Sequence, residues 1–290
     1  MFKDILRINS KPGRCIPQKG NPALLVSQPE VNDAFHSAGI QSGSVLMIHS
    51  SLSSMGRVER GADGFVDYCM DYLGPAGTLC VPAFWWVPTD PPMRVIDFDV
   101  HYSPCFNGAI SEAVRRRRET YRSNNPSHSV CAIGKQAEEI TKTHGTYGFR
   151  PGPYGWNAFA ADSPWERLYQ MNAWYGFIGV DMGCNTMAHY AEHLLFEEIL
   201  EQANAEDKEI LINNVSATFY PFPGWWPYFS FEDMGKQLEL EGLVKKSTIG
   251  SADFLAIRSQ DMVDSILRLV KANPGGWFLK PHAAPFLKWL

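Results

Sequence analysis

Three residues with acid–base chemistry occur within five positions of one predicted helix. They are His189, Glu192 and His193, and they follow an apolar run that predicts a strand. Asn185 or Thr186 is a suitable N-cap, so we expect the helix to begin there. Residues three and four apart share a helix face, so His189 can contact both of its neighbours. A histidine beside a carboxylate is the arrangement of a general base and the group that orients it.

The same residues also fit a metal site. Residues 189–193 have the pattern H-x-x-E-H of the inverted zinc peptidases, in which both histidines bind the metal and the glutamate activates water. Such a site needs a third protein ligand, for which Glu239 and Glu241 are downstream candidates. Acidic residues are common, so their presence does not decide between a zinc-dependent hydrolase and a base pair.

The elements upstream of this helix predict parallel strands. Residues 44–49 and 77–84 are strand-like apolar runs, and residues 61–74 between them predict an amphipathic helix closed by glycine. A strand, a helix and a strand in this order are typical of a parallel sheet. Residues 175–180 predict the strand that leads into the helix of His189.

We expect one domain over residues 1–290. Residues 1–28 are rich in Pro, Gly and Lys and predict an N-terminal arm, and residues 201–290 predict a smaller C-terminal α+β portion packed on the body. Within this portion, residues 208–222 alternate like a strand or hairpin, and residues 244–257 suggest two short strands around a glycine. The predicted fold class is α/β, with a central, largely parallel or mixed sheet flanked by helices.

Composition excludes several partner classes. The formal charge of -5, from 31 acidic and 26 basic residues, gives no general attraction for nucleic acid or an anionic membrane. The N-terminus lacks a hydrophobic signal core, and no window reaches the roughly 18 apolar residues of a membrane span. Six cysteines without a C-x-x-C pair suggest reduced thiols. We therefore predict a cytoplasmic protein without nucleic acid or membrane partners; a homodimer is compatible with the sequence.

Seven separated motifs occur in a fixed order along the chain. They are residues 49–58, residues 61–63, residues 74–79, Phe98-Asp99 with Ser103-Pro104, residues 108–112, Arg122-Ser123 with Pro126 and His128-Ser129, and Asn185-Thr186 with His189 and Glu192. Together they resemble the aminoglycoside 3-N-acetyltransferase family, also called the antibiotic N-acetyltransferase family. The resemblance implies an antibiotic N-acetyltransferase-like fold that transfers an acetyl group from acetyl-coenzyme A to an amine, with no metal.

The resemblance also assigns a role to individual residues. Thr186, His189 and Glu192 match the catalytic positions of the family. His189 would accept the proton of the attacking amine, Glu192 would orient the ring, and Thr186 near the helix start would hydrogen-bond the reacting carbonyl oxygen. In the family the small-residue loop belongs to the coenzyme A side of the site. An arginine is suited to phosphate, so the residues around Arg122 are a second candidate anchor, with a structural salt bridge as the alternative. These residues are Ser50, Ser51, Leu52 and Ser53, and then Arg122, Ser123 and Ser129.

The expected acceptor site combines acidic and aromatic side chains. Aminoglycosides are polycations and need carboxylates, whereas the aromatic loops predicted around the cleft suit a flatter or more apolar acceptor. The residues that we assign to substrate binding are Asp63, Phe84, Trp85, Asp99 and Trp225. Residues 85–106 form a long loop that we expect over the site. The predicted acceptor is therefore a primary amine of an aminoglycoside or a related molecule.

Two interpretations remain beside a catalytic His189. A chain with the same fold that binds coenzyme A without turnover would be insensitive to His189→Ala, and the zinc-dependent hydrolase stays open at this point. His128 and His144 are secondary candidates for acid or base chemistry. Isolated histidines are more often packing or surface residues.

Overall fold

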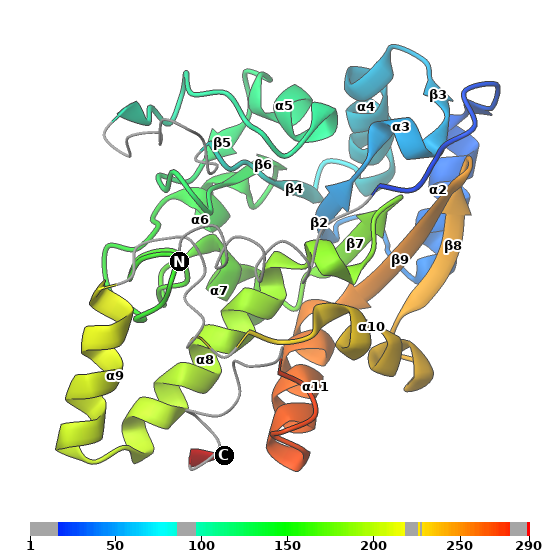
Figure 1. The fold of residues 1–290 in the computed structure, drawn as a ribbon. Coiled ribbons are helices and arrows are strands. Elements are labelled where there is room, and N and C mark those ends of the chain that lie inside the picture. Colours follow the sequence, from blue (N-terminus) through cyan, green and yellow to red (C-terminus); the bar gives the residue numbers. More distant parts are fainter. Residues whose placement is uncertain (1–16, 86–96, 218–225, 227, 279–288) are drawn as a thin grey trace.

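A seven-stranded mixed sheet forms the centre of the molecule (Figure 1). The computed structural model describes residues 17–85, 97–217, 226, 228–278 and 289–290. The strand order is β5-β6-β4-β2-β7-β9-β8, and a small separate sheet pairs β1 with β3. The strands are β1 (Leu25–Val26), β2 (Val45–Ser50), β3 (Arg57–Val58), β4 (Thr78–Pro82), β5 (Tyr121–Arg122), β6 (Val130–Gly134), β7 (Trp174–Ile178), β8 (Lys245–Ile249) and β9 (Ala252–Arg258).

The middle of the sheet is parallel and its flanks are antiparallel. Strand β2 pairs in parallel with β4 and with β7, so that Met47 lies opposite Cys80 on one side and Tyr175 on the other. Helix α4 (Gly61–Leu73) connects β2 to β4, as the order of the predicted elements required. Strand β6 is antiparallel to β4, and β9 is antiparallel to β7. The predicted α/β class with a mixed sheet is confirmed.

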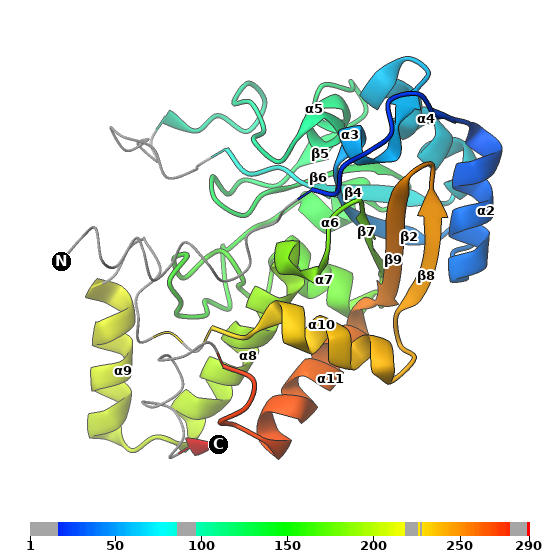
Figure 2. The same cartoon turned by 45° about the vertical axis from the view of Figure 1, so that its right-hand side comes forward.

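Alternating strand residues build a separate core on each face of the sheet. In β2, Leu46 and Ile48 belong to one cluster of buried residues and Met47 belongs to the other. Successive side chains of a strand point to opposite faces, so an entirely apolar strand requires cover on both sides. The first core lies against α2 (Gln28–Ala38), α4 and α5 (Ala109–Arg115). The second lies against α6 (Ala137–Thr141), α7 (Pro164–Gln170), α8 (Thr186–Gln202) and α11 (Ser259–Ala272), as Figure 2 shows.

Local capping signals explain where several helices begin and end. The Ser163 hydroxyl accepts a hydrogen bond from the Glu166 backbone N–H, and Pro164 occupies the first turn of α7. Helix α2 ends at Gly39, whose φ of 86° places it in the left-handed region that glycine adopts without strain. Both boundaries follow from residues that lie next to them in the sequence.

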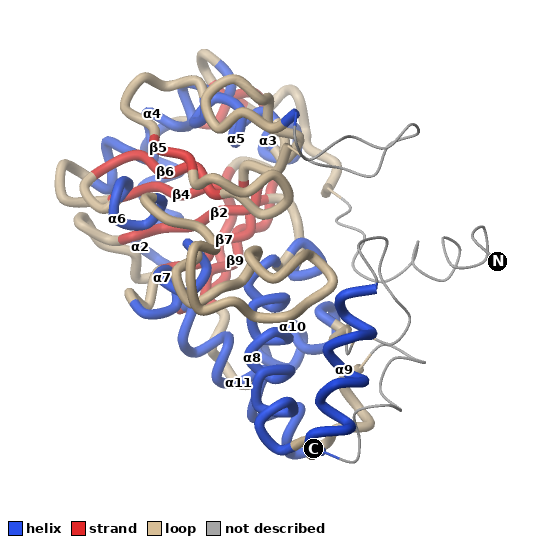
Figure 3. Tube along the Cα trace, turned by 90° about the vertical axis from the view of Figure 1, so that its left-hand side faces the viewer, coloured by secondary structure: helices blue, strands red, loops and turns tan. Residues whose placement is uncertain are grey.

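The C-terminal third contains the one clear error in the predicted elements. Residues 205–217 form helix α9 (Ala205–Ala217), so the strand or hairpin expected over residues 208–222 is wrong for residues 208–217. Residues 218–222 lie outside the described residues. Asn204 caps this helix by accepting the Asp207 backbone N–H through its side chain, at 2.9 Å. Exposed Ile210 and buried Leu211 mimic the alternation of a strand, but the surrounding Ala, Glu and Lys favour a helix. Figure 3 shows α9 beside α8, on the side of the sheet away from α4 and α5.

The predicted strands around Gly250 do form, and they extend the main sheet. Strands β8 and β9 pair as an antiparallel hairpin, and β9 then pairs with β7. Helix α10 (Phe231–Leu240) precedes the hairpin and packs on the same core as α8 and α11. Within the described residues, no helix is long and apolar enough to cross a membrane.

Candidate active site

The first turn of α8 presents Thr186 and His189 to a large cavity. Strand β7 leads through a short 3-10 turn, η2 (Met182–Cys184), to Asn185, which is the N-cap of α8. The Asn185 side chain accepts the Ala188 backbone N–H at 3.3 Å. This cap fixes the direction of the helix, so that Thr186 and His189 line the cavity.

The His189 ring is held by a buried carboxylate. Its Nδ1 lies 2.8 Å from Glu192 Oε2, and the His189 side chain is 19% exposed whereas that of Glu192 is 0% exposed. The Tyr154 hydroxyl lies 3.1 Å from each nitrogen of the ring. A carboxylate oxygen accepts, so a neutral His189 ring that donates to Glu192 carries its proton on Nδ1. The predicted pairing of His189 with Glu192 is therefore present in the fold.

Two residues far along the chain complete the environment of Glu192. The Trp226 indole N–H donates to Oε2 at 3.0 Å, and the Phe229 backbone N–H donates to Oε1 at 2.9 Å. A carboxylate without partners is costly to bury, and these donors, together with His189, satisfy both oxygens. No local sequence signal points to them, because they lie 34 and 37 residues from Glu192.

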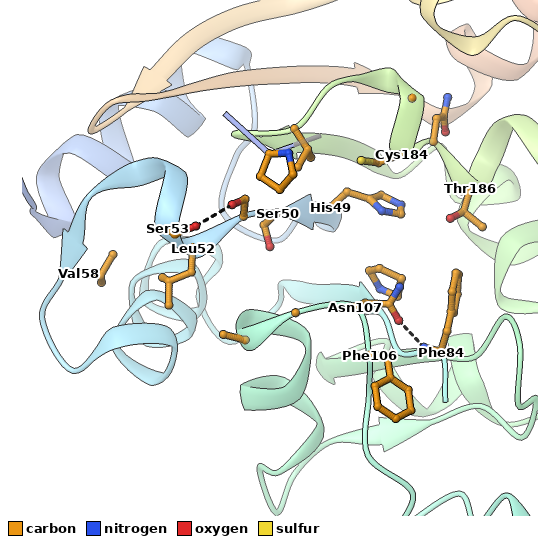
Figure 4. Close-up of a pocket in the computed structure, with 18 of the residues that line it drawn as sticks. His49, Ser50, Leu52, Ser53, Val58, Phe84, Phe106, Asn107, Cys184 and Thr186 are labelled. Carbon is orange, nitrogen blue, oxygen red and sulfur yellow. Dashed lines mark hydrogen bonds between the residues drawn. The ribbon is translucent and has the colours of Figure 1, made fainter. Parts of the chain in front are cut away.

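The cavity has a volume of about 860 Å³ and is shown in Figure 4. The predicted coenzyme A loop, Ser50, Ser51, Leu52 and Ser53, forms one wall, and Thr186 and His189 line it from α8. The loop is more regular than expected, because residues 52–55 form the short helix α3 (Leu52–Met55). The Ser51 backbone N–H donates to Ile178 at the end of β7, which ties the loop to the strand before α8.

The predicted second anchor lies outside this cavity. The Arg122 guanidinium donates to the carbonyl oxygens of Ser103 and Ala83 and to the Ser129 hydroxyl. The Ser123 hydroxyl bonds with His144 Nδ1 at 2.8 Å. Arg122, Ser123 and Ser129 are not among the residues that line the cavity. The fold uses them to join separate chain segments, which is the structural alternative for such an arginine.

Of the three predicted aromatic substrate residues, one lines the cavity, one does not, and one lies outside the described residues. Phe84 lines it, whereas Trp85 is buried against Phe98 with a ring separation of 5.8 Å and is not part of the wall. Trp225 lies outside the described residues. Phe106, from the loop that we expected over the site, does line the cavity.

The predicted acidic substrate residues do not face the cavity. Asp63 and Asp99 are exposed and absent from its lining. Asp99 instead accepts the backbone N–H groups of Tyr102 and His101, which lower the pKa of its carboxyl group. It closes a local turn, as aspartate commonly does.

His128 and His144 are buried packing residues. His144 donates from Nε2 to the Ala158 carbonyl oxygen at 2.9 Å and accepts from Ser123, so both nitrogens have partners. Burial lowers the pKa of His144 to about 4. Burial also lowers the pKa of His128 well below its usual range, and the His128 ring packs on Phe84 at a ring separation of 5.0 Å.

The zinc interpretation lacks a ligand set. His193 donates from Nδ1 to the His189 carbonyl oxygen, and its Nε2 is buried against Gly152, so neither nitrogen faces the cavity. Glu239 and Glu241 instead form ion pairs with Lys246 and Arg268. Among the residues that the structure describes, no group of three His, Cys, Asp or Glu side chains is placed to hold a metal.

The cysteines agree only in part with the expectation of reduced thiols. Cys69, Cys80, Cys105 and Cys131 are free and buried. Cys184, which lines the cavity beside Thr186, is disulfide-bonded. The spacing of the six cysteines in the sequence did not predict a disulfide at Cys184.

The sequence matches a known family. The sequence model described as aminoglycoside 3-N-acetyltransferase matches residues 47–271. The chain belongs to this family. Aminoglycoside N(3)-acetyltransferase III of Pseudomonas aeruginosa is 26% identical over 270 residues, which cover 84% of this chain and 93% of the relative. The predicted family and the predicted acyltransferase class are therefore confirmed.

Two solved structures have the same fold. The aminoglycoside acetyltransferase AAC(3)-IVa, solved as a mutant in complex with a gentamicin, has a TM-score of 0.67 and 21% identity. The match covers 92% of this chain and 98% of that structure. AAC-IIIb, solved with CoASH, has a TM-score of 0.65 and 18% identity, and the match covers 89% and 99% of the two chains.

Proposed function

We propose that this protein transfers an acetyl group from acetyl-coenzyme A to a primary amine of an aminoglycoside or a related molecule. The observation that carries the proposal is the pairing of His189 with buried Glu192 at the edge of a large cavity, in a chain of this family. The CoASH complex of AAC-IIIb supports the cosubstrate, and the gentamicin complex of AAC(3)-IVa supports an amine acceptor.

The reaction requires one proton to move from nitrogen to sulfur. The amine nitrogen attacks the thioester carbonyl carbon, its bond to carbon forms, and the carbon–sulfur bond breaks. His189 Nε2 accepts the proton that the amine sheds and then delivers it to the leaving thiolate, which gives CoASH. Glu192 holds the ring through Nδ1 and stabilises the transient imidazolium, and Thr186 hydrogen-bonds the carbonyl oxygen.

The wall formed by residues 50–53 suits the coenzyme. Three of its four residues are serines, whose small side chains let a pantetheine arm approach the backbone closely. The neighbouring Asn107, Gly108 and Ala109 at the start of α5 continue the same wall. Since Arg122, Ser123 and Ser129 bond elsewhere in the fold, the proposal places the coenzyme on Ser50, Ser51, Leu52 and Ser53 alone.

The acceptor side of the cavity is aromatic. Phe84, Phe106 and Phe231 line it, and its described lining contains Arg57 but no Asp or Glu. Aromatic faces bind flat or apolar groups, and they bind a single ammonium group by cation–π contact. Within the proposed class, these walls favour an amine of low charge over an aminoglycoside that carries several ammonium groups.

A thiol-release assay with acetyl-coenzyme A tests the proposal directly. The acceptor panel should pair gentamicin and apramycin with arylalkyl monoamines of similar amine basicity. We expect amine-dependent release of CoASH with at least one acceptor, and its loss in His189→Gln. Coenzyme A binding without release for any acceptor would instead identify a non-catalytic binding protein.

A further inference from the structure

His49 is a second histidine of the cavity that the proposed reaction does not yet use. It is the fifth residue of β2 and directly precedes the loop of Ser50 to Ser53. Its side chain lines the cavity although the residue is only 7% exposed. The ring stacks on Phe177 with a centroid separation of 5.8 Å, and Figure 4 shows it pointing toward the side of the cavity that carries Thr186.

A tyrosine contacts one nitrogen of His49. The Tyr175 hydroxyl oxygen lies 2.7 Å from His49 Nε2. The same oxygen is approached by the backbone N–H groups of Met187 and Thr186 and by the Thr186 side chain, at the start of α8. When the N–H groups and the Thr186 hydroxyl donate to this oxygen, its own hydrogen points to His49. In that arrangement Nε2 accepts, and a neutral ring carries its hydrogen on Nδ1.

Burial keeps the ring neutral, because it lowers the pKa of His49 to about 3. Nδ1 makes no hydrogen bond to the described residues, and it is not among the fully buried polar atoms that lack a partner. It is therefore the ring atom that remains open to the cavity. The result is a neutral N–H donor held in a fixed orientation beside Thr186.

We propose that His49 is a catalytic electrophile that donates its Nδ1–H to the carbonyl oxygen of the bound acetyl thioester. The proposal rests on the proposed function, and it places a donor from β2 beside Thr186 of α8. The oxygen gains negative charge as the amine attacks, and a preorganised donor is most effective at that point. The His49 proton is not transferred, so the proton balance through His189 is unchanged.

The arrangement has a clear physical basis. A neutral imidazole can serve as an electrophile when a helix N-terminus opposes its protonation. Here the start of α8 acts through Tyr175, whose oxygen contacts both the helix N–H groups and His49. The same hydroxyl thus contacts both His49 and Thr186 and holds them in one fixed relation.

Nitrogen NMR of the imidazoles tests the tautomer and the contact without requiring turnover. In ¹⁵N-labelled protein at pH 7, the His49 signals, assigned by their loss in His49→Asn, should show a protonated Nδ1 and an unprotonated Nε2. Acetyl-coenzyme A should shift the Nδ1–H signal, and CoASH, which lacks the acetyl carbonyl, should not. A protonated Nε2, or equal shifts with the two ligands, would overturn the proposal.

Matched variants test the catalytic effect. The Asn amide can place an N–H near the position of Nδ1, whereas the longer Gln amide reaches toward Nε2. We expect His49→Gln to lower kcat about 100-fold, the scale of a lost oxyanion donor, and His49→Asn to retain at least about tenfold more activity. Coenzyme A affinity and Tm should change little in either variant. Equal losses in the two variants would contradict a role for Nδ1. If the wild type acetylates no amine, the proposed function fails, and the NMR comparison still decides whether His49 Nδ1–H contacts the acetyl carbonyl.

Discussion

His189 and His193 lie one turn apart on the same helix and have opposite environments. His189 lines the cavity and is held by Glu192 and Tyr154. His193 is fully buried, its Nδ1 is bonded to the helix backbone, and its Nε2 has no hydrogen-bond partner among the described residues. The loop at Gly152 and the ring of Trp226 cover it. A sequence pattern treats the two histidines alike, but the segments that pack on the helix leave one ring at the cavity and bury the other.

The largest effect that separates the two histidines should be on turnover. We expect His189→Gln to lower kcat by about 10²–10⁴, the range that general acid–base catalysis contributes. His193→Gln should leave kcat within about threefold, because that ring does not reach the cavity. Steady-state kinetics with the best acceptor of the panel measures both. Similar losses in the two variants would revive a shared role such as metal binding.

Glu192→Gln should have the next largest effect. The amide of the variant has one accepting oxygen, whereas the Glu192 carboxylate has two. The amide therefore cannot accept from His189, Trp226 and the Phe229 backbone N–H together, and at least one of these donors faces its NH₂ group. We expect kcat to fall about 10- to 100-fold, within the scale of general-base catalysis, and stability to fall by about 1–3 kcal/mol. Kinetics and urea unfolding measure the two quantities.

Glu197→Gln is the matched control for that variant, since Glu197 lies on the same helix, is 45% exposed and bonds to Arg150. It should change kcat by less than twofold. A comparable loss of activity in both variants would show that the effect comes from the charge of α8 and not from the orientation of His189.

Gly152→Ala should destabilise the protein through His193. A Cβ at this position would lie 1.8 Å from His193 Nε2, so the loop or the ring must move. Overpacking of this kind costs about 1–3 kcal/mol, and urea unfolding should show the loss. Adding His193→Ala should recover part of it, because the atom in conflict is removed. Gly275→Ala, where the added Cβ meets nothing within 4 Å, is the control.

The smallest effect should appear in the pH dependence of stability. Burial lowers the pKa of His193 to about 3 in the folded state, from its ordinary value of 6.5. Between these values the unfolded chain binds more protons, so His193 lowers stability as the pH falls below 6.5. The loss should be about 1.4 kcal/mol at pH 5.5 relative to neutral pH. Urea unfolding at pH 7.5 and 5.5 should show a smaller pH difference for His193→Gln, whereas His36→Gln, at an exposed position, should leave the difference unchanged.

Most of the fold was predictable because its signals are local. The apolar runs and the glycine after α4 each act over a few residues, and the corresponding elements form near the predicted positions. The strand or hairpin predicted over residues 208–222 was wrong for residues 208–217, because a short Ile-Leu-Ile run resembles a strand while the capping at Asn204 and the flanking residues favour a helix. Short apolar runs carry this ambiguity whenever periodicity is the only guide.

The sequence by itself determined that His189 and Glu192 meet, because residues three apart share a face of any helix. It also placed Ser50 to Ser53 after a buried strand, from which they reach the cavity. Only the tertiary structure decided that Arg122 joins chain segments, that Trp226 and Phe229 hold Glu192, and that Tyr175 orients His49. These contacts join residues far apart in the chain, so they depend on how the layers pack, which no local pattern specifies.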